Sequence, residues 1–163
     1  MACESCEPRD PDELLLLDDE REPDASDGAE PPWRLLVVDD EPSVLNATEL
    51  VLKDHRCAGR RLALTRAQSA AEARAILAQD PPFALALVDV VMETEHAGLE
   101  LIDHIRHEPA LSSMRVVVRS GQAGRVDRAT VLARGDIDGY WSKTELSAAV
   151  LRQSVCQTLQ AAA

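Results

Sequence analysis

Basic residues are scarce in this chain. Its 163 residues include 17 Lys and Arg against 29 Asp and Glu, which gives a formal net charge of −12. No basic patch interrupts the acidic excess, and a surface of this sign repels the phosphates of nucleic acids and anionic lipids. We therefore expect neither nucleic acid nor a membrane as a direct partner.

The acidic N-terminal part also lacks a long apolar run. The four leucines at 14–17 are far too few to span a bilayer. No basic segment precedes them, as one would in a signal peptide. We expect a cytoplasmic protein.

Cysteine is sparse as well, with four residues in the chain. Cys3 and Cys6 have the C-x-x-C spacing, but zinc would need two further ligands. Cys57 and Cys156 stand far from this pair and from each other in the sequence. The pattern predicts free thiols in a reducing cytoplasm.

The negative charge is concentrated at the N-terminus. Residues 1–32 contain 12 acidic and 2 basic residues, so this segment carries −10 of the net charge and 33–163 carries −2. Asp, Glu and Pro dominate the segment, which has too little apolar surface to offset the entropy of ordering. We predict a disordered tail over 1–32 and one domain over 33–163. The leucines at 14–17 fit either a short docking motif or an ordinary part of that tail.

From position 33 onward the pattern alternates strand with helix. Ser69 followed by Glu72 is a capping box at the start of the second helix, and the prolines at 81 and 82 end it. The pattern predicts strands at 35–38, 62–65, 84–89, 115–119 and 137–141, and helices at 42–54, 70–78, 99–107, 125–134 and 144–160. Five such repeats predict an α/β fold, with a doubly wound five-stranded parallel sheet and helices on both faces.

The helical spacing of apolar residues also predicts which helix faces are buried. In the first helix the expected inward residues are Val44, Ala47, Val51 and Leu52. In the last helix they are Leu146, Val150, Val155 and Leu159.

Carboxylates stand where two of the predicted strands end. Asp39 and Asp40 follow the first strand, and Asp89 ends the third. Open α/β sheets bind ligands beyond the carboxyl ends of their strands. Alone, the pair at 39–40 would also fit a cluster at a helix N-terminus. Together with Asp89 it predicts a metal site with a reactive aspartate.

Four segments occur in the order and spacing of a bacterial response-regulator receiver domain. They are Val-Val-Asp-Asp-Glu at 37–41, Leu-Val-Asp at 87–89, Val-Arg-Ser-Gly at 118–121 and Tyr-Trp-Ser-Lys at 140–143. The chain from 33 to 159 resembles this family, which implies a flavodoxin-like sheet with strand order 2-1-3-4-5.

Two segments, at 89–99 and 119–122, are similar to one subgroup of the family. Its receiver domains stand near the N-terminus of larger signalling proteins that carry a cyclic di-GMP phosphodiesterase, a diguanylate cyclase or a histidine kinase. The resemblance leaves open whether the chain is a stand-alone regulator or the front of a longer protein.

The resemblance implies roles for the acidic residues. Asp89 is the expected phosphoacceptor, which receives a phosphoryl group from a histidine kinase. Mg²⁺, or Mn²⁺ in its place, is the expected cofactor, because such ions prefer oxygen ligands. The residues expected to hold it are Asp39, Asp40, Asp89 and, through its backbone carbonyl, Val91.

Further roles follow from the same resemblance. Lys143 and Ser120 would bind phosphoryl oxygens, and Ser120 and Tyr140 would form the conformational switch. Taken singly, Lys143 also fits a surface lysine, Ser120 a turn residue and Tyr140 a core aromatic. Val91 and Gln122 occupy the positions that tune hydrolysis, and a valine cannot orient water, which predicts a slowly hydrolysing phosphorylated state.

The expected activity is regulatory. The domain would phosphorylate itself from a donor and slowly dephosphorylate itself, and would not be an enzyme in its own right. An effector or a second copy would bind to the face formed by the fourth helix, fifth strand and last helix.

Two other functions remain open. A phosphatase of the haloacid-dehalogenase type needs Asp-x-Asp after its first strand, and the Asp-Asp-Glu-Pro at 39–42 lacks it. A degenerate receiver would keep the fold and only bind partners. In favour of this reading, the loop from 89 to 98 is one residue longer than in the chemotaxis regulators. The presence of all five site residues argues against it. As a separate departure, Glu93 and Thr144 stand where the family usually has proline.

Overall fold

Strands and helices alternate along the chain, as the apolar pattern predicts. The computed structural model describes residues 30–121 and 126–161. The predicted tail, apart from residues 30–32, and Gln122 lie outside these residues. The strands are β1 (Trp33–Val38), β2 (Arg56–Cys57), β3 (Arg60–Ala67), β4 (Leu85–Asp89), β5 (Arg115–Ser120) and β6 (Gly139–Ser142). The helices are α1 (Pro42–Leu52), α2 (Ala70–Gln79), α3 (Ala97–His107), α4 (Arg128–Ala133), α5 (Ala148–Gln160) and a 3-10 turn (Pro109–Leu111).

The sheet has the order β2-β3-β1-β4-β5-β6. All neighbours from β3 to β6 pair in parallel, so the predicted order 2-1-3-4-5 is confirmed. The prediction of five strands was one short, because β2 pairs antiparallel with the outer edge of β3. Only two residues long, β2 shows no apolar alternation. Ala58 and Gly59 join it to β3 at φ 52° and 79°, as a tight hairpin requires.

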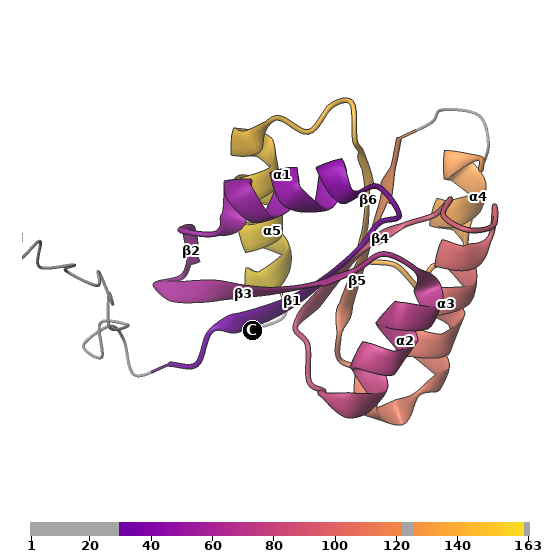
Figure 1. The fold of residues 1–163 in the computed structure, drawn as a ribbon, viewed down its shortest axis with the longest axis horizontal. Helices are drawn as coiled ribbons and strands as arrows, with labels where there is room; N and C mark the ends of the chain where they lie inside the picture. The colour runs from indigo at the N-terminus through magenta and orange to yellow at the C-terminus, as the bar shows by residue number, and fades with distance from the viewer. Residues whose placement is uncertain (1–29, 122–125, 162–163) are drawn as a thin grey trace, which may run out of the picture.

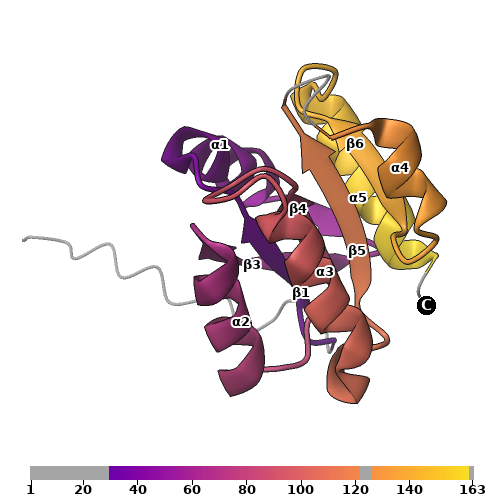
Figure 2. The ribbon, with the colours of Figure 1, turned by 90° about the vertical axis from the view of Figure 1, so that its right-hand side faces the viewer.

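Helices cover both faces of the sheet (Figure 1). One core layer lies beneath α2, α3 and α4 and receives Leu36, Val38 and Val88 from the strands. The other lies beneath α1 and α5 and receives alternate residues such as Leu35 and Val37. Figure 2 shows α2 and α3 side by side on the first of these faces. This is the predicted doubly wound arrangement, in which strands buried on both faces read as continuous apolar runs.

The helical faces were predicted only in part. In α1 the buried residues are Leu45, Thr48 and Leu52, whereas Ala47 is exposed and Val44 and Val51 are half-buried. The buried stripe is therefore rotated by about one residue from the prediction.

The last helix begins four residues later than predicted. The Ser147 side chain caps α5 by accepting a hydrogen bond from the Val150 N–H over 3.3 Å. Leu151, Val155 and Leu159 then share the buried face at helical spacing, and Val150 is 43% exposed instead of inward. Leu146 precedes the helix and is partly buried against the same core layer.

The prediction of free thiols is wrong for two of the cysteines. Cys57 in β2 and Cys156 in α5 form a disulfide, with 5.1 Å between their Cα atoms and 99 residues between them in the chain. The fold brings β2 beside α5 (Figure 1), a proximity that sequence spacing does not reveal. Cys3 and Cys6 lie outside the described residues. Among the helices that the structure describes, none is long and apolar enough to cross a membrane.

Candidate functional site

Three carboxylates meet at one edge of the sheet. Asp39 follows β1 and Asp89 ends β4, and these strands are parallel neighbours with Val38 opposite Val88. One carboxylate oxygen from each of Asp39, Asp40 and Asp89 lies within 4.8 Å of the others. Asp39 and Asp89 are buried, whereas Asp40 is exposed. Clustered carboxylate oxygens are the donors that Mg²⁺ and Mn²⁺ prefer, so these residues fit a divalent cation.

Lys143 bridges the two buried carboxylates. Its Nζ lies 2.7 Å from Asp39 Oδ2 and 2.9 Å from Asp89 Oδ2. The residue follows β6, and its backbone N–H donates to the Ser120 carbonyl over 2.9 Å. Burial would lower the pKa of Lys143, but its bonds to the two carboxylates outweigh burial and raise it. The ammonium therefore stays charged at the centre of the cluster.

Asp89 is the carboxylate most affected by its surroundings. Its pKa is raised, first because burial disfavours the charged form and also because Asp39 lies nearby. Lys143 opposes this increase, as does the Val91 N–H, which donates to Asp89 Oδ1 over 3.3 Å. Neighbouring positive charge thus favours the ionised form of Asp89, against the effect of burial.

Arg119 is a second cation at this site, and the sequence analysis missed it. It pairs in register with Asp89 across β5 and β4, and only 6% of it is exposed. Its Nη1 donates to Thr48 Oγ1 over 2.9 Å, whereas its Nε has no hydrogen-bond partner among the described residues. Burial lowers the pKa of Arg119, against the opposing effect of Asp39 and Asp89. The sequence does contain a feature that could have identified Arg119: an arginine directly follows three valines in a strand that is buried on both faces.

The loop after Asp89 is held by backbone contacts. The Gly98 N–H donates to the Val90 carbonyl over 3.1 Å, which closes the loop onto the start of α3. Glu93 accepts a hydrogen bond from the Ala70 N–H over 3.0 Å. This bond ties the loop to the first turn of α2. Val91 is half-buried against the core beneath α2, α3 and α4.

Residues 35–155 match the family model described as the response regulator receiver domain. The chain belongs to this family. The match spans every described element from β1 to most of α5, so the resemblance inferred from short motifs is confirmed.

Similar proteins agree with this family. The 3'3'-cGAMP-specific phosphodiesterase 2 of Vibrio cholerae is 43% identical over 130 residues, which are 80% of this chain and 25% of that protein. The chain thus spans a quarter of the length of this curated relative.

Solved structures show the same fold. The CheY-like receiver domain protein of Methanospirillum hungatei has a TM-score of 0.64 at 22% identity and covers 80% of this chain and 96% of its own. A putative response regulator of Chloroflexus aurantiacus has a TM-score of 0.65 at 25% identity, covering 79% and 98%. The Mn²⁺-bound form of response regulator Rcp1 has a TM-score of 0.59 at 22% identity, covering 77% and 91%.

The two expected switch residues of the receiver lie on adjacent strands. Ser120 ends β5, where it is almost fully buried, and Tyr140 lies in β6 opposite Val118. Tyr140 is half-buried against the core beneath α2, α3 and α4. The Arg128 guanidinium lies 5.3 Å from the centroid of its ring. Movement of this ring would therefore alter the surface beside α4.

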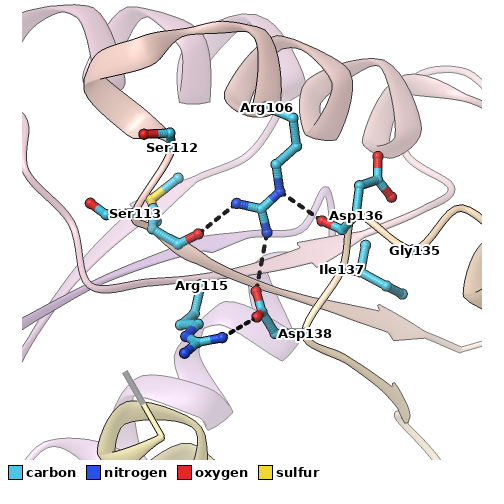
Figure 3. A pocket seen from close by; sticks show the side chains of 9 residues that line it. Arg106, Ser112, Ser113, Arg115, Gly135, Asp136, Ile137 and Asp138 are labelled. Carbon is cyan, nitrogen blue, oxygen red and sulfur yellow. Dashed lines mark hydrogen bonds and ion pairs between the residues drawn. The ribbon is translucent and has the colours of Figure 1, made fainter. Parts of the chain in front are cut away.

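A pocket of about 510 Å³ lies at the opposite edge of the sheet, where β5 and β6 begin (Figure 3). Two guanidiniums in its wall contact one carboxylate: Asp138 lies 2.6 Å from Arg115 and 3.1 Å from Arg106. Arg106 also donates to the carbonyls of Met114 and Asp136. Asp138 and the two backbone carbonyls already accept hydrogen bonds from these guanidiniums, so we interpret the contacts as a structural clamp between α3, β5 and the segment before β6.

A smaller pocket of about 240 Å³ lies between α1 and α5 and extends to Arg119 and Lys143, the two cations beside the acidic cluster. Arg119, Lys143 and Thr48 contribute to its polar wall, and Val51 and Leu151 to its apolar wall. The two cations of the site therefore line this cavity.

Proposed function

We propose that this receiver domain accepts a phosphoryl group on Asp89 from a histidine kinase. The observation that carries the proposal is the double ion pair of Lys143 with Asp39 and Asp89 at the carboxyl edge of the sheet. An aspartyl oxygen is a competent nucleophile toward phosphorus, but the negative charges of nucleophile and donor must be offset. This site gathers positive charge around one buried carboxylate.

The transfer itself needs little covalent chemistry from the protein. One oxygen of Asp89 bonds to phosphorus, and the bond from phosphorus to the donor nitrogen breaks, so the kinase histidine leaves. Lys143 then pairs with a phosphoryl oxygen as a point charge. Ser120 donates a hydrogen bond to another oxygen of the same group.

Asp39, Asp40, Asp89 and the Val91 carbonyl are the groups that would hold Mg²⁺ or Mn²⁺. When bound, the ion would neutralise charge shared by the acceptor carboxylate and the phosphoryl group. The Mn²⁺-bound response regulator among the similar structures supports a divalent cation in this fold.

The consequence of phosphorylation would be a change at the face formed by α4, β6 and α5. A phosphoryl group adds about −1.5 to −2 charge and draws Ser120 toward it, which leaves room for Tyr140 to turn inward. This face carries two exposed apolar residues, Leu132 in α4 at 45% and Val150 in α5 at 43%. Such residues suit a partner surface.

The partner would be an effector or a second copy of the chain. The phosphodiesterase name of the Vibrio cholerae relative supports a receiver that regulates an output domain acting on cyclic nucleotides. The receiver itself would have no turnover beyond its own phosphorylation and slow dephosphorylation. The reaction belongs in the cytoplasm, together with its kinase donor.

The test uses acetyl phosphate and Mg²⁺ with the full chain, followed by intact mass measurement. Wild type and Asp89→Asn are compared, with Asp54→Asn as the matched control, because Asp54 is an exposed aspartate in the turn after α1. The proposal expects one phosphoryl adduct on wild type and Asp54→Asn and none on Asp89→Asn. Continuous release of phosphate would instead support a phosphatase. Absence of any adduct would support a degenerate receiver that only binds partners.

A further inference from the structure

A second chemically active cluster lies away from the acidic site. Cys57 in β2 and Cys156 in α5 are bonded to each other. His55 stands just before β2, and its Nε2 lies 3.3 Å from Cys156 Sγ. Two sulfurs and an imidazole therefore meet where the edge of the sheet contacts the last helix.

The two sulfurs differ in their access to solvent. Cys57 is 1% exposed, and its carbonyl accepts a hydrogen bond from Trp33 Nε1 over 3.1 Å. The Arg60 guanidinium covers the ring of Trp33, 3.7 Å from the ring centroid. Cys156, by contrast, is half-buried, and its Sγ lies within hydrogen-bonding distance of the His55 imidazole. An oxidant from solvent thus reaches Cys156 first.

We infer that Cys57 and Cys156 form a reversible redox site for hydroperoxides, in which Cys156 reacts first and Cys57 resolves the product. Thiolate character and exposure together decide which cysteine is oxidised. His55 favours the thiolate of Cys156, because an adjacent imidazole can take the thiol proton. The Cα separation of 5.1 Å lies within the range that a disulfide spans without backbone movement.

The reaction has two steps. The Cys156 thiolate attacks one oxygen of the hydroperoxide, the O–O bond breaks, and the product is a sulfenic acid plus water or an alcohol. The Cys57 thiolate then attacks Cys156 Sγ, the S–S bond forms, and the sulfenic oxygen leaves as water. The two thiols lose two electrons and the peroxide gains them. A small dithiol reverses the reaction by thiol–disulfide exchange.

The bond connects β2 to α5, the helix whose other end lies near the phosphorylation site. Oxidation ties the C-terminal half of α5 to β2, beside the hydrogen bond from Arg152 Nε to the Val51 carbonyl of α1. The other end of α5 begins at Ser147, which lines the same cavity as Lys143. The redox site is chemically independent of Asp89 and acts on the opposite end of the same helix.

The test uses the full chain with Cys3→Ser and Cys6→Ser, so that the pair supplies the only thiols. The reduced protein is treated with hydrogen peroxide, alkylated and weighed. We expect loss of both alkylation sites, a mass lower by two hydrogens, and recovery of both thiols in dithiothreitol without denaturant. Reduction only after denaturation would overturn the inference, because the bond would then be a permanent crosslink.

Variants assign the two sulfurs. With dimedone present as a sulfenic acid trap, Cys57→Ala is expected to be labelled at Cys156, and Cys156→Ser is expected to stay unlabelled. Label at Cys57 would contradict the assignment. If Cys57→Ala does not fold, dimedone added to the otherwise unchanged protein during oxidation identifies the first sulfur to react.

The role of His55 is tested by rate. His55→Ala is expected to slow oxidation about tenfold, whereas Asp89→Asn is expected to leave the rate unchanged. That comparison separates failure of the redox site from failure of the phosphoacceptor. An unchanged rate in His55→Ala would remove the imidazole from the scheme. Tight binding of Zn²⁺ by the reduced pair, with protection from peroxide, would replace a redox site by a metal site.

Discussion

The backbone of Gly98 packs against the carbonyl oxygen of Asp89 so closely that a Cβ at position 98 would lie 2.0 Å from that oxygen. The Cα of Val90 would be only 2.7 Å away. Both neighbours are backbone atoms, which cannot rotate aside as a side chain would. The acceptor loop can therefore adopt this geometry only because the glycine at position 98 has no Cβ.

We predict that Gly98→Ala displaces this loop. Overpacking typically destabilises a protein by about 1–3 kcal/mol, and we expect the upper part of that range. The yield of phosphoryl adduct on Asp89 should fall as well, because the acceptor moves relative to Lys143. Urea unfolding and intact mass measure the two effects. Glu95→Ala, an exposed change in the same loop, is the control, and an unchanged unfolding midpoint in Gly98→Ala would refute the prediction.

Removal of the buried cation at Arg119 should strengthen binding of Mg²⁺. The guanidinium lies near Asp39 and Asp89, so its charge competes with that of an incoming divalent ion. Coulomb energies of one to a few kcal/mol for such pairs suggest that Arg119→Met tightens binding about tenfold. Calorimetric titration measures the affinity directly.

Stability provides a second readout for Arg119. An apolar side chain of similar length removes a buried, incompletely bonded guanidinium, so Arg119→Met should unfold no more easily than wild type. Lys53→Met, on the exposed surface of the domain, controls for loss of one positive charge. Weaker Mg²⁺ binding in Arg119→Met would show that the arginine supports the site instead of competing with the ion.

Much of the fold could be predicted because its signals are local. All five residues of β4 are buried, so the strand reads as one apolar run that ends in Asp89. Ser69 caps α2 through the Glu72 N–H over 3.1 Å, as the capping box predicts. The start of α5 was misplaced because both Thr144 and Ser147 are suitable caps, and only tertiary packing selects Ser147.

The parts that could not be predicted depend on contacts between distant segments. Arg119 and Thr48 are 71 residues apart and meet only when the fold brings the Arg119 side chain from β5 to α1. Cys57 and Cys156 are 99 residues apart. The carboxylates, in contrast, could be placed because the ends of neighbouring parallel strands share one edge. For the arginine and the cysteines, the sequence shows the residue type but not the distant residue that it contacts.

Acid should weaken the clamp around Asp138. Burial alone would raise the pKa of Asp138, but the Val116 N–H and the guanidiniums of Arg115 and Arg106 outweigh burial and lower it. A carboxyl whose pKa is lower in the folded state than in the unfolded state stabilises the fold at pH values above its unfolded-state pKa. That stabilisation is lost as the pH falls through its folded-state pKa.

We therefore predict that Asp138→Asn is less stable than wild type by about 1 kcal/mol at neutral pH, because solvent screens this partly exposed carboxylate. The difference should shrink as the pH falls below the ordinary carboxyl value of 3.8. Urea unfolding over a pH series measures it, with Asp54→Asn as the exposed control. A difference that stays constant through the acid range would contradict a role for the ionised carboxylate.

The phosphorylated domain should hydrolyse slowly because of Val91. This side chain is half-buried against the core and has no polar group with which to orient an attacking water. Val91→Asn supplies an amide at the same position and should shorten the lifetime of the adduct about tenfold. Val91→Ala changes the size without adding a polar group and serves as the control. After removal of acetyl phosphate, intact mass follows the loss of the phosphoryl group with time. A wild-type half-life of seconds in Mg²⁺, or equal lifetimes for the Asn and Ala variants, would show that another residue controls the attacking water.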